Sequence, residues 1–168
     1  MKYAVVYASA TGNTAMLAEE IRSYMKNAEC VYFGEAKENI PAADIIFAGF
    51  WTDKGNCSDE IGNYLAGLQG QKIFLFGTAG FGGSKEYFSR ILEQVKGHIP
   101  DGNTVIGTFM CQGKMPASVK ARYEKMLESD PENERIKAML INFDQALSHP
   151  DHHDLEELRA AVQKAVGA

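Results

Sequence analysis

The stretch that decides the fold is residues 2–14, which read Lys-Tyr-Ala-Val-Val-Tyr-Ala-Ser-Ala-Thr-Gly-Asn-Thr. Its first half, Tyr3 to Ala8, is a continuous apolar run, as expected of a strand covered on both faces of a parallel sheet. Its second half is small and hydroxylated, and apolar residues at helical spacing follow from about Asn13 to Lys26. A strand, a small polar turn and a helix in this order present backbone N–H groups to an anion.

The same alternation of strand and helix continues to residue 111. Further short apolar strands are predicted at residues 30–33, 44–50, 72–77 and 104–111. Ser58 and Ser84 stand at the cap positions of two helices, and residues 35–41 form a polar connection with room for a helical turn. This pattern is typical of an α/β fold with a parallel sheet and helices on both faces. Five strands suit the order 2-1-3-4-5.

The pattern changes after Cys111. Residues 115–148 contain no predicted strand and read as two helices separated by Pro131, and a last helix runs from about Asp154 to Val166. There is no linker or repeat. We therefore expect a single domain over residues 1–168, with a core of residues 1–114 and C-terminal helices in residues 115–168.

Composition excludes several classes of protein. The chain is 45% apolar and 23% charged with a net charge of −5, which excludes a disordered chain and argues against a nucleic-acid partner. No apolar run reaches the length of a membrane span, so we expect no membrane insertion. The beginning of the sequence lacks a leader pattern, and three widely spaced cysteines fit a reducing compartment, so a cytoplasmic location is expected.

The order 2-1-3-4-5 places a ligand beyond the carboxyl ends of the strands, among the loops after strands one, three and four. The candidate binding residues are Ser9, Ala10, Thr11, Gly12, Asn13 and Thr14 in the first loop, Phe50, Trp51, Thr52, Lys54 and Gly55 in the second, and Thr78, Ala79, Gly80, Phe81, Gly82 and Gly83 in the third.

The first loop has no lysine or arginine, which fits a monophosphate held by neutral donors. It lacks the Gly-Lys-Ser/Thr ending of a P-loop and the Gly-x-Gly-x-x-Gly of a dinucleotide site. Trp51 is suited to stacking on a planar heterocycle, Lys54 to approaching an anionic reduced ring, and the glycines of the third loop to lying against a ligand edge. The plainer alternatives are a capped helix start, a tryptophan that closes the top of the sheet and a solvated lysine.

The first loop resembles the phosphate loop of flavodoxins, and Trp51 with residues 78–83 falls where that family places the loops beside its flavin ring. The resemblance implies a flavodoxin-like three-layer sandwich that binds FMN. It also implies a protein that has no catalytic acid or base of its own and carries electrons between two redox partner proteins, a reductase and an acceptor. The sheet lacks the long insertion in strand five, as in short-chain members. Residues 49–55 and 109–116 are similar to a narrower subfamily associated with bilirubin reduction, which would make residues 115–148 a docking or lid element.

Two other functions are compatible with a chain of alternating strands and helices. The alternative is a stand-alone FMN-dependent NAD(P)H:quinone-type oxidoreductase. A receiver domain is rejected because Ala8-Ser9-Ala10 offers no acidic residue after the first strand.

Some residues elsewhere in the chain have two interpretations. The cluster of His149, His152 and His153 could ligate a metal but is better interpreted as the polar start of a helix, and Asp154 with Glu157 resembles a capping pair. Redox roles for Cys57 and Cys111 remain open at this point.

Overall fold

The computed structural model describes residues 1–82 and 84–167. In chain order the elements are β1 (Lys2–Tyr7), α1 (Asn13–Tyr24), β2 (Glu29–Gly34), β3 (Ile45–Trp51), α2 (Asp59–Ala66), β4 (Lys72–Ala79), α3 (Lys85–Lys96), β5 (Thr104–Gln112), α4 (Ala117–Ser129), α5 (Glu134–Ala146) and α6 (His152–Val166). No helix within the described residues is both long enough and apolar enough to cross a membrane.

The five strands form one parallel sheet in the order β2-β1-β3-β4-β5, which confirms the predicted topology. The three interior strands are almost fully buried because helices cover both faces. Two glycines let large rings pack across the central pair: a Cβ at Gly49 would lie 2.3 Å from Phe76, and one at Gly77 would lie 2.3 Å from Phe50.

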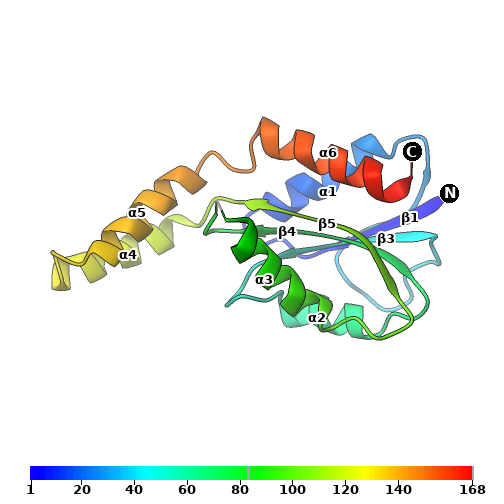
Figure 1. The fold of residues 1–168 in the computed structure, drawn as a ribbon, viewed down its shortest axis with the longest axis horizontal. Coiled ribbons are helices and arrows are strands. Elements are labelled where there is room, and N and C mark those ends of the chain that lie inside the picture. The colour runs from blue at the N-terminus through cyan, green and yellow to red at the C-terminus, as the bar shows by residue number, and fades with distance from the viewer. Residues whose placement is uncertain (83, 168) are drawn as a thin grey trace.

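The helices form the two outer layers of a three-layer sandwich (Figure 1). Helices α1 and α6 pack on one face, where Leu17 and Leu158 are fully buried. Helices α2 and α3 pack on the other, where Ile61 and Val95 are fully buried. Each face of the sheet therefore has its own apolar core.

Helices α4 and α5 form an antiparallel pair that projects away from the sandwich (Figure 1). We call residues 114–149, which include this pair and its two connections, the arm. The buried side chains of the pair are those of Tyr123, Ile136, Phe143 and Ala146, and an ion pair joins Lys120 to Asp144 at 3.2 Å. The two helices predicted in residues 115–148 are thus present.

The structure corrects several expectations about where elements begin and end. Trp51 ends β3 and pairs with Thr78, and both Thr78 and Ala79 belong to β4, because ladder pairing continues to Gln112 of β5. These residues were expected in loops. The segment of residues 35–44 contains no helix.

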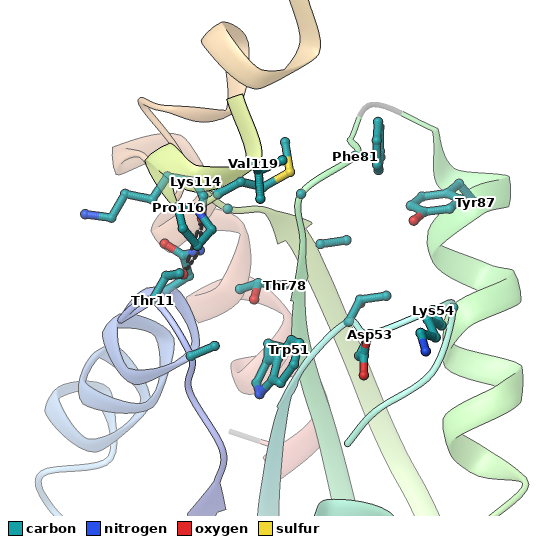
Figure 2. A pocket seen from close by; sticks show the side chains of 18 of the residues that line it. Thr11, Trp51, Asp53, Lys54, Thr78, Phe81, Tyr87, Lys114, Pro116 and Val119 are labelled. Carbon is teal, nitrogen blue, oxygen red and sulfur yellow. Dashed lines mark hydrogen bonds between the residues drawn. The ribbon is translucent and has the colours of Figure 1, made fainter. Parts of the chain in front are cut away.

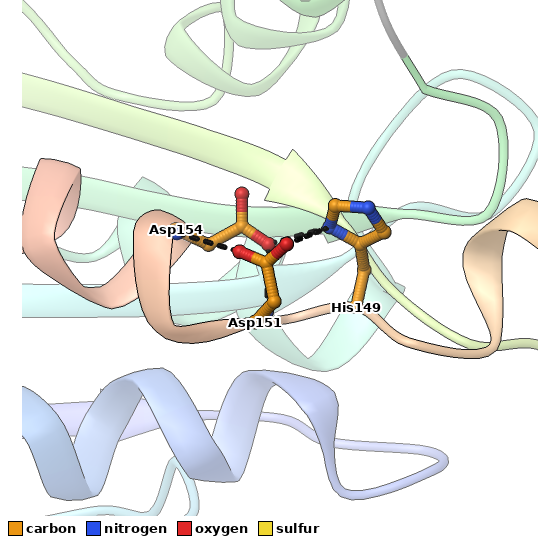
Figure 3. Close-up of side chains that lie close together, drawn as sticks. All are labelled: His149, Asp151 and Asp154. Carbon is orange, nitrogen blue, oxygen red and sulfur yellow. Dashed lines mark hydrogen bonds and ion pairs between the residues drawn. The ribbon is translucent and has the colours of Figure 1, made fainter.

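Helix α6 begins two residues earlier than expected, and its cap differs from the predicted one. The Asp151 carboxylate accepts a hydrogen bond from the Asp154 N–H at 2.9 Å, and the Asp154 carboxylate accepts one from the Asp151 N–H at 2.8 Å. Asp154 Oδ2 also lies 2.6 Å from Nδ1 of His149 (Figure 3). The reciprocal pair is therefore Asp151 with Asp154, and these carboxylates hold the connection between the arm and α6.

Candidate functional site

A cavity of about 550 Å³ lies at the carboxyl edge of the sheet, where the loops after β1, β3, β4 and β5 meet (Figure 2). This size is normal for a cavity that holds a small molecule or cofactor. The described residues that line it are Ala10, Thr11, Asn13, Trp51, Thr52, Asp53, Lys54, Gly55, Thr78, Ala79, Gly80, Phe81, Tyr87, Gly113, Lys114, Met115, Pro116, Val119, Arg122 and Tyr123.

The first loop ends at the N-terminus of α1. Gly12 is the cap residue, with a left-handed φ of 87°, and nothing lies within 4 Å of the place where a Cβ would stand. The hydroxyl of Ser9 accepts a hydrogen bond from the Ala15 N–H at 3.2 Å. No acidic side chain occupies the first turn of α1. The positive end of this helix is therefore available to an anionic ligand.

Thr14 has a different place from the one that the sequence predicted. Its side chain is buried, its hydroxyl donates to the carbonyl oxygen of Phe50 at 3.1 Å, and it lies 3.2 Å from the hydroxyl of Thr78. These contacts join α1 to the ends of β3 and β4. Thr14 thus links the start of α1 to the ends of β3 and β4, and its side chain is not among the described residues that line the cavity.

The second loop supplies one wall of the cavity. The half-buried indole of Trp51 lies at the end of β3, next to Thr78 (Figure 2). The hydroxyl of Thr52 is buried and has no hydrogen-bond partner within the described part of the chain, which leaves it free for a ligand.

A tight turn follows Thr52. Asp53 and Asn56 exchange two backbone hydrogen bonds, of 2.8 and 3.1 Å, around Lys54 and Gly55. Both central residues have positive φ, 51° and 80°. The hydrogen bonds and the strained φ of Lys54 define the backbone at this rim of the cavity.

The third loop is held by side chains from two other elements. The carbonyl oxygen of Gly80 accepts hydrogen bonds from Gln112 of β5 and from Asn142 of α5, both at 3.0 Å. A Cβ at Gly80 would stand 2.6 Å from Met115, and one at Gly82 would stand 2.6 Å from Gln112. Gly80 therefore allows the arm to approach the loop closely, and Gly82 does the same for the end of β5.

The root of the arm closes the cavity on the remaining side. The carbonyl oxygen of Lys114 accepts hydrogen bonds from Asn13 Nδ2 at 2.8 Å and from Thr11 Oγ1 at 3.3 Å, while its N–H donates to the carbonyl of His149 at 3.0 Å. Beyond it, Met115, Pro116, Val119, Arg122 and Tyr123 face the cavity.

Most of the expected site residues are brought together at the cavity: Ala10, Thr11, Asn13, Trp51, Thr52, Lys54, Gly55, Thr78, Ala79, Gly80 and Phe81. Five other expected residues are not among the described lining residues: Ser9, Gly12, Thr14, Phe50 and Gly82. Phe50 is fully buried in the core. Gly83 lies outside the described residues.

The sequence analysis missed the wall formed by Tyr87 and by residues 113–123. One feature of the predicted topology would have indicated most of this wall. The carboxyl end of β5 reaches the same edge of the sheet as the ends of β1, β3 and β4, so the segment after β5 enters the site as well.

Burial raises the pKa of three groups near this edge: the Tyr87 hydroxyl and the thiols of Cys57 and Cys111. Cys111 is almost completely buried and its pKa is raised further by the nearby carboxylates of α6, so it stays a neutral thiol at physiological pH. A thiolate-based redox role is therefore unfavourable for both cysteines.

The donor set fits FMN. A helix N-terminus and neutral hydroxyls suit its phosphate, Trp51 suits a flat ring, and the Thr52 hydroxyl, buried without a partner among the described residues, is available to a polar atom of the ligand.

Comparison with known proteins identifies the family. The family model described as "Flavodoxin domain" matches residues 4–163, so the chain belongs to the flavodoxin family, whose members bind FMN. It is similar to the flavodoxin-like domain-containing protein BilS of Clostridium symbiosum (strain WAL-14163), at 42% identity over 100% of this chain and 97% of that one. The BilS protein of Clostridioides difficile (strain CD3) is 37% identical, over 94% of this chain and 92% of that one.

Solved structures agree on the fold. Oxidised Flavodoxin 2 from Bacillus cereus has a TM-score of 0.62 at 18% identity and is covered completely, as is this chain. A short-chain flavodoxin associated with a non-canonical PDU bacterial microcompartment has a TM-score of 0.60 at 16% identity, over 99% of this chain and 97% of that one.

Proposed function

We propose that this protein is an FMN-binding electron carrier that passes electrons to or from a partner redox enzyme. The observation that carries the proposal is the cavity at the carboxyl edge of the sheet, where a helix N-terminus, neutral hydroxyls and Trp51 meet. Bound FMN takes up or releases one or two electrons and so supplies the redox chemistry.

The residues of the chain have separate tasks in this proposal. The N–H groups at the start of α1 hold the phosphate, and the hydroxyl of Thr11 exchanges its bond to the Lys114 carbonyl for one to the phosphate. Trp51 covers the ring and keeps water from it, and the unpaired hydroxyl of Thr52 meets a polar atom of the ligand. The third loop lies along the ring edge, where its position is determined by Gln112 and Asn142.

The cavity wall supports a carrier because no two of its described ionisable side chains are hydrogen-bonded to each other as a nucleophile–base or acid–base pair. The ionisable side chains among the described lining residues are Asp53, Lys54, Tyr87, Lys114, Arg122 and Tyr123, with no histidine, cysteine or glutamate. A protein of this kind sets the redox potential of its bound flavin and docks on a partner protein.

The test begins with the purified protein. It should be yellow and should release one FMN, not FAD, on denaturation. Trp51→Ala should weaken FMN binding and shift the midpoint potential, whereas the same change at Tyr24, at the C-terminal end of α1 and not among the residues that line the cavity, should do neither. A colourless protein that fails to bind added FMN would end the proposal.

One observation favours a second candidate, the stand-alone FMN oxidoreductase. The arm covers part of the cavity with Met115, Val119 and Tyr123, which gives a small substrate apolar surface to lie against. Steady oxidation of NAD(P)H by the purified protein alone, with a quinone as acceptor, would favour this function over the carrier.

A further inference from the structure

The net charge of the residues that line the cavity is opposite in sign to the net charge of the whole chain. The net charge is −5. Among the described lining residues, however, Lys54, Lys114 and Arg122 are basic and Asp53 alone is acidic. None of the three basic side chains forms an ion pair with another described residue. Among the described lining residues, the basic side chains therefore outnumber the acidic ones by three to one and have no carboxylate partner.

The arm continues this asymmetry along its length. At its root Lys114 and Arg122 are exposed, and the sequence has no acidic residue between Asp101 and Glu124. At its tip, between Lys125 and Arg135, every charged residue is acidic: Glu128, Asp130, Glu132 and Glu134. Helix α4 has 13 residues. Since each helical residue adds about 1.5 Å, α4 is about 20 Å long, and Arg122 lies about 9 Å along the helix from Glu128.

The basic root is not needed to hold the phosphate of the cofactor. The first loop and the start of α1 already provide neutral donors there, and the side chain of Lys114 points away from the cavity (Figure 2). Charges at a rim act on what approaches it, because complementary potentials steer and orient an encounter between proteins.

We propose that the basic rim, formed by Lys54, Lys114 and Arg122, is the docking surface for the partner redox protein and fits an acidic face around the redox centre of that partner. This inference rests on the carrier function proposed above. Phe81, which also lines the cavity and is 40% exposed, lies across the cavity from Lys114 (Figure 2) and supplies apolar contact. The acidic tip repels the acidic face of the partner, so the partner docks at the root, beside the flavin.

The test uses two defined protein probes, acidic cytochrome b5 and basic cytochrome c, with the FMN-loaded protein. Binding is measured by calorimetry at low ionic strength, and the contact surface by amide chemical shifts of the labelled carrier. The variant is Lys114→Glu/Arg122→Glu. The matched control, Lys26→Glu/Lys164→Glu, makes the same change in net charge with exposed residues near the other edge of the sheet.

The root variant should bind cytochrome b5 about tenfold more weakly, a change of about 1.4 kcal/mol, since two attractive contacts are lost and replaced by repulsion. It should bind cytochrome c more tightly than the unmodified protein does. The control should stay within about twofold for cytochrome b5, and added salt should remove the difference. Chemical shifts should change at residues 54, 81 and 114–122.

Three results would overturn the proposal. The first is equal weakening of cytochrome b5 binding in the root variant and the control. The second is loss of FMN by the root variant alone, which would assign these cations to the cofactor. The third is self-association of the unmodified protein that the root variant abolishes, which would make a second copy the occupant. If the unmodified protein binds no FMN, the carrier function itself fails, and that outcome is distinct from all three.

Discussion

Replacing Thr14 by valine separates two roles that a hydroxyl at this position could have. The buried hydroxyl bonds the Phe50 carbonyl at 3.1 Å and lies 3.2 Å from the Thr78 hydroxyl. Valine keeps the shape and removes both contacts, so two buried partners each lose a hydrogen bond of about 1 kcal/mol. The free energy of unfolding of the FMN-free protein should fall by about 2 kcal/mol.

That loss can be expressed as a change in melting temperature. The entropy of unfolding is about 2.1 cal/mol/K per residue, which is about 0.35 kcal/mol/K for a chain of this length. Thr14→Val should therefore lower the Tm of the FMN-free protein by about 6 °C. Thr14→Ser keeps the hydroxyl and deletes one buried methyl group, so it should cost at most about 1 kcal/mol.

FMN affinity distinguishes the two roles. Because the Thr14 side chain lies behind the cavity wall, Thr14→Val should change the dissociation constant of FMN by less than about threefold. Thr11→Val is the matched comparison, since Thr11 lines the cavity and is not buried. It should weaken FMN binding about tenfold, with a stability change within about 0.5 kcal/mol. The reverse pattern, with Thr14→Val losing FMN and keeping its stability, would show that Thr14 contacts the phosphate and refute the reasoning.

Three further predictions concern residues around the arm and the edges of the sheet. Asn142→Ala removes one of the two donors on the Gly80 carbonyl and should weaken FMN binding about fivefold, as measured by titration. The exposed thiol of Cys30 should react with a thiol reagent in the native protein, whereas Cys111, whose pKa is raised by burial, should react only after unfolding. The pKa of the Asp151 carboxyl is lowered, first by the backbone hydrogen bond that caps α6. Its contribution to stability is therefore present above the ordinary aspartate pKa and is lost as the pH falls through the lower folded value, so Asp151→Ala should flatten the acid limb of the unfolding free energy.

The topology could be predicted because each interior strand is a short apolar run and each helix repeats its apolar residues at helical spacing. Both patterns are local. The ends of β3 and β4 could not be located this way: Trp51 and Thr78 have the composition of a loop, but they pair with each other across the ladder. Pairing between strands that are distant in the sequence produces no recognisable pattern within either strand alone.

Half of the cavity wall was missed for the same reason. Thr11, Trp51 and Gly80 stand in loops whose composition is unusual. Gly113 and Lys114 follow a strand without such a signal, and what makes them part of the site is contact with the first loop, about 100 residues earlier in the chain. The hydrogen bond from Asn142 to Gly80 spans 62 residues.

These long-range hydrogen bonds join the arm to the loops of the cavity at two points. The carbonyl of Lys114 is held by Asn13 of the first loop, and the carbonyl of Gly80 in the third loop is held by Asn142 of α5. A ligand that orders both loops therefore also orders the root of the arm. Binding free energies couple reciprocally, so a partner that favours one position of the arm changes FMN affinity by the same factor by which FMN changes the affinity for that partner. We therefore expect docking on the arm and retention of the cofactor to be coupled.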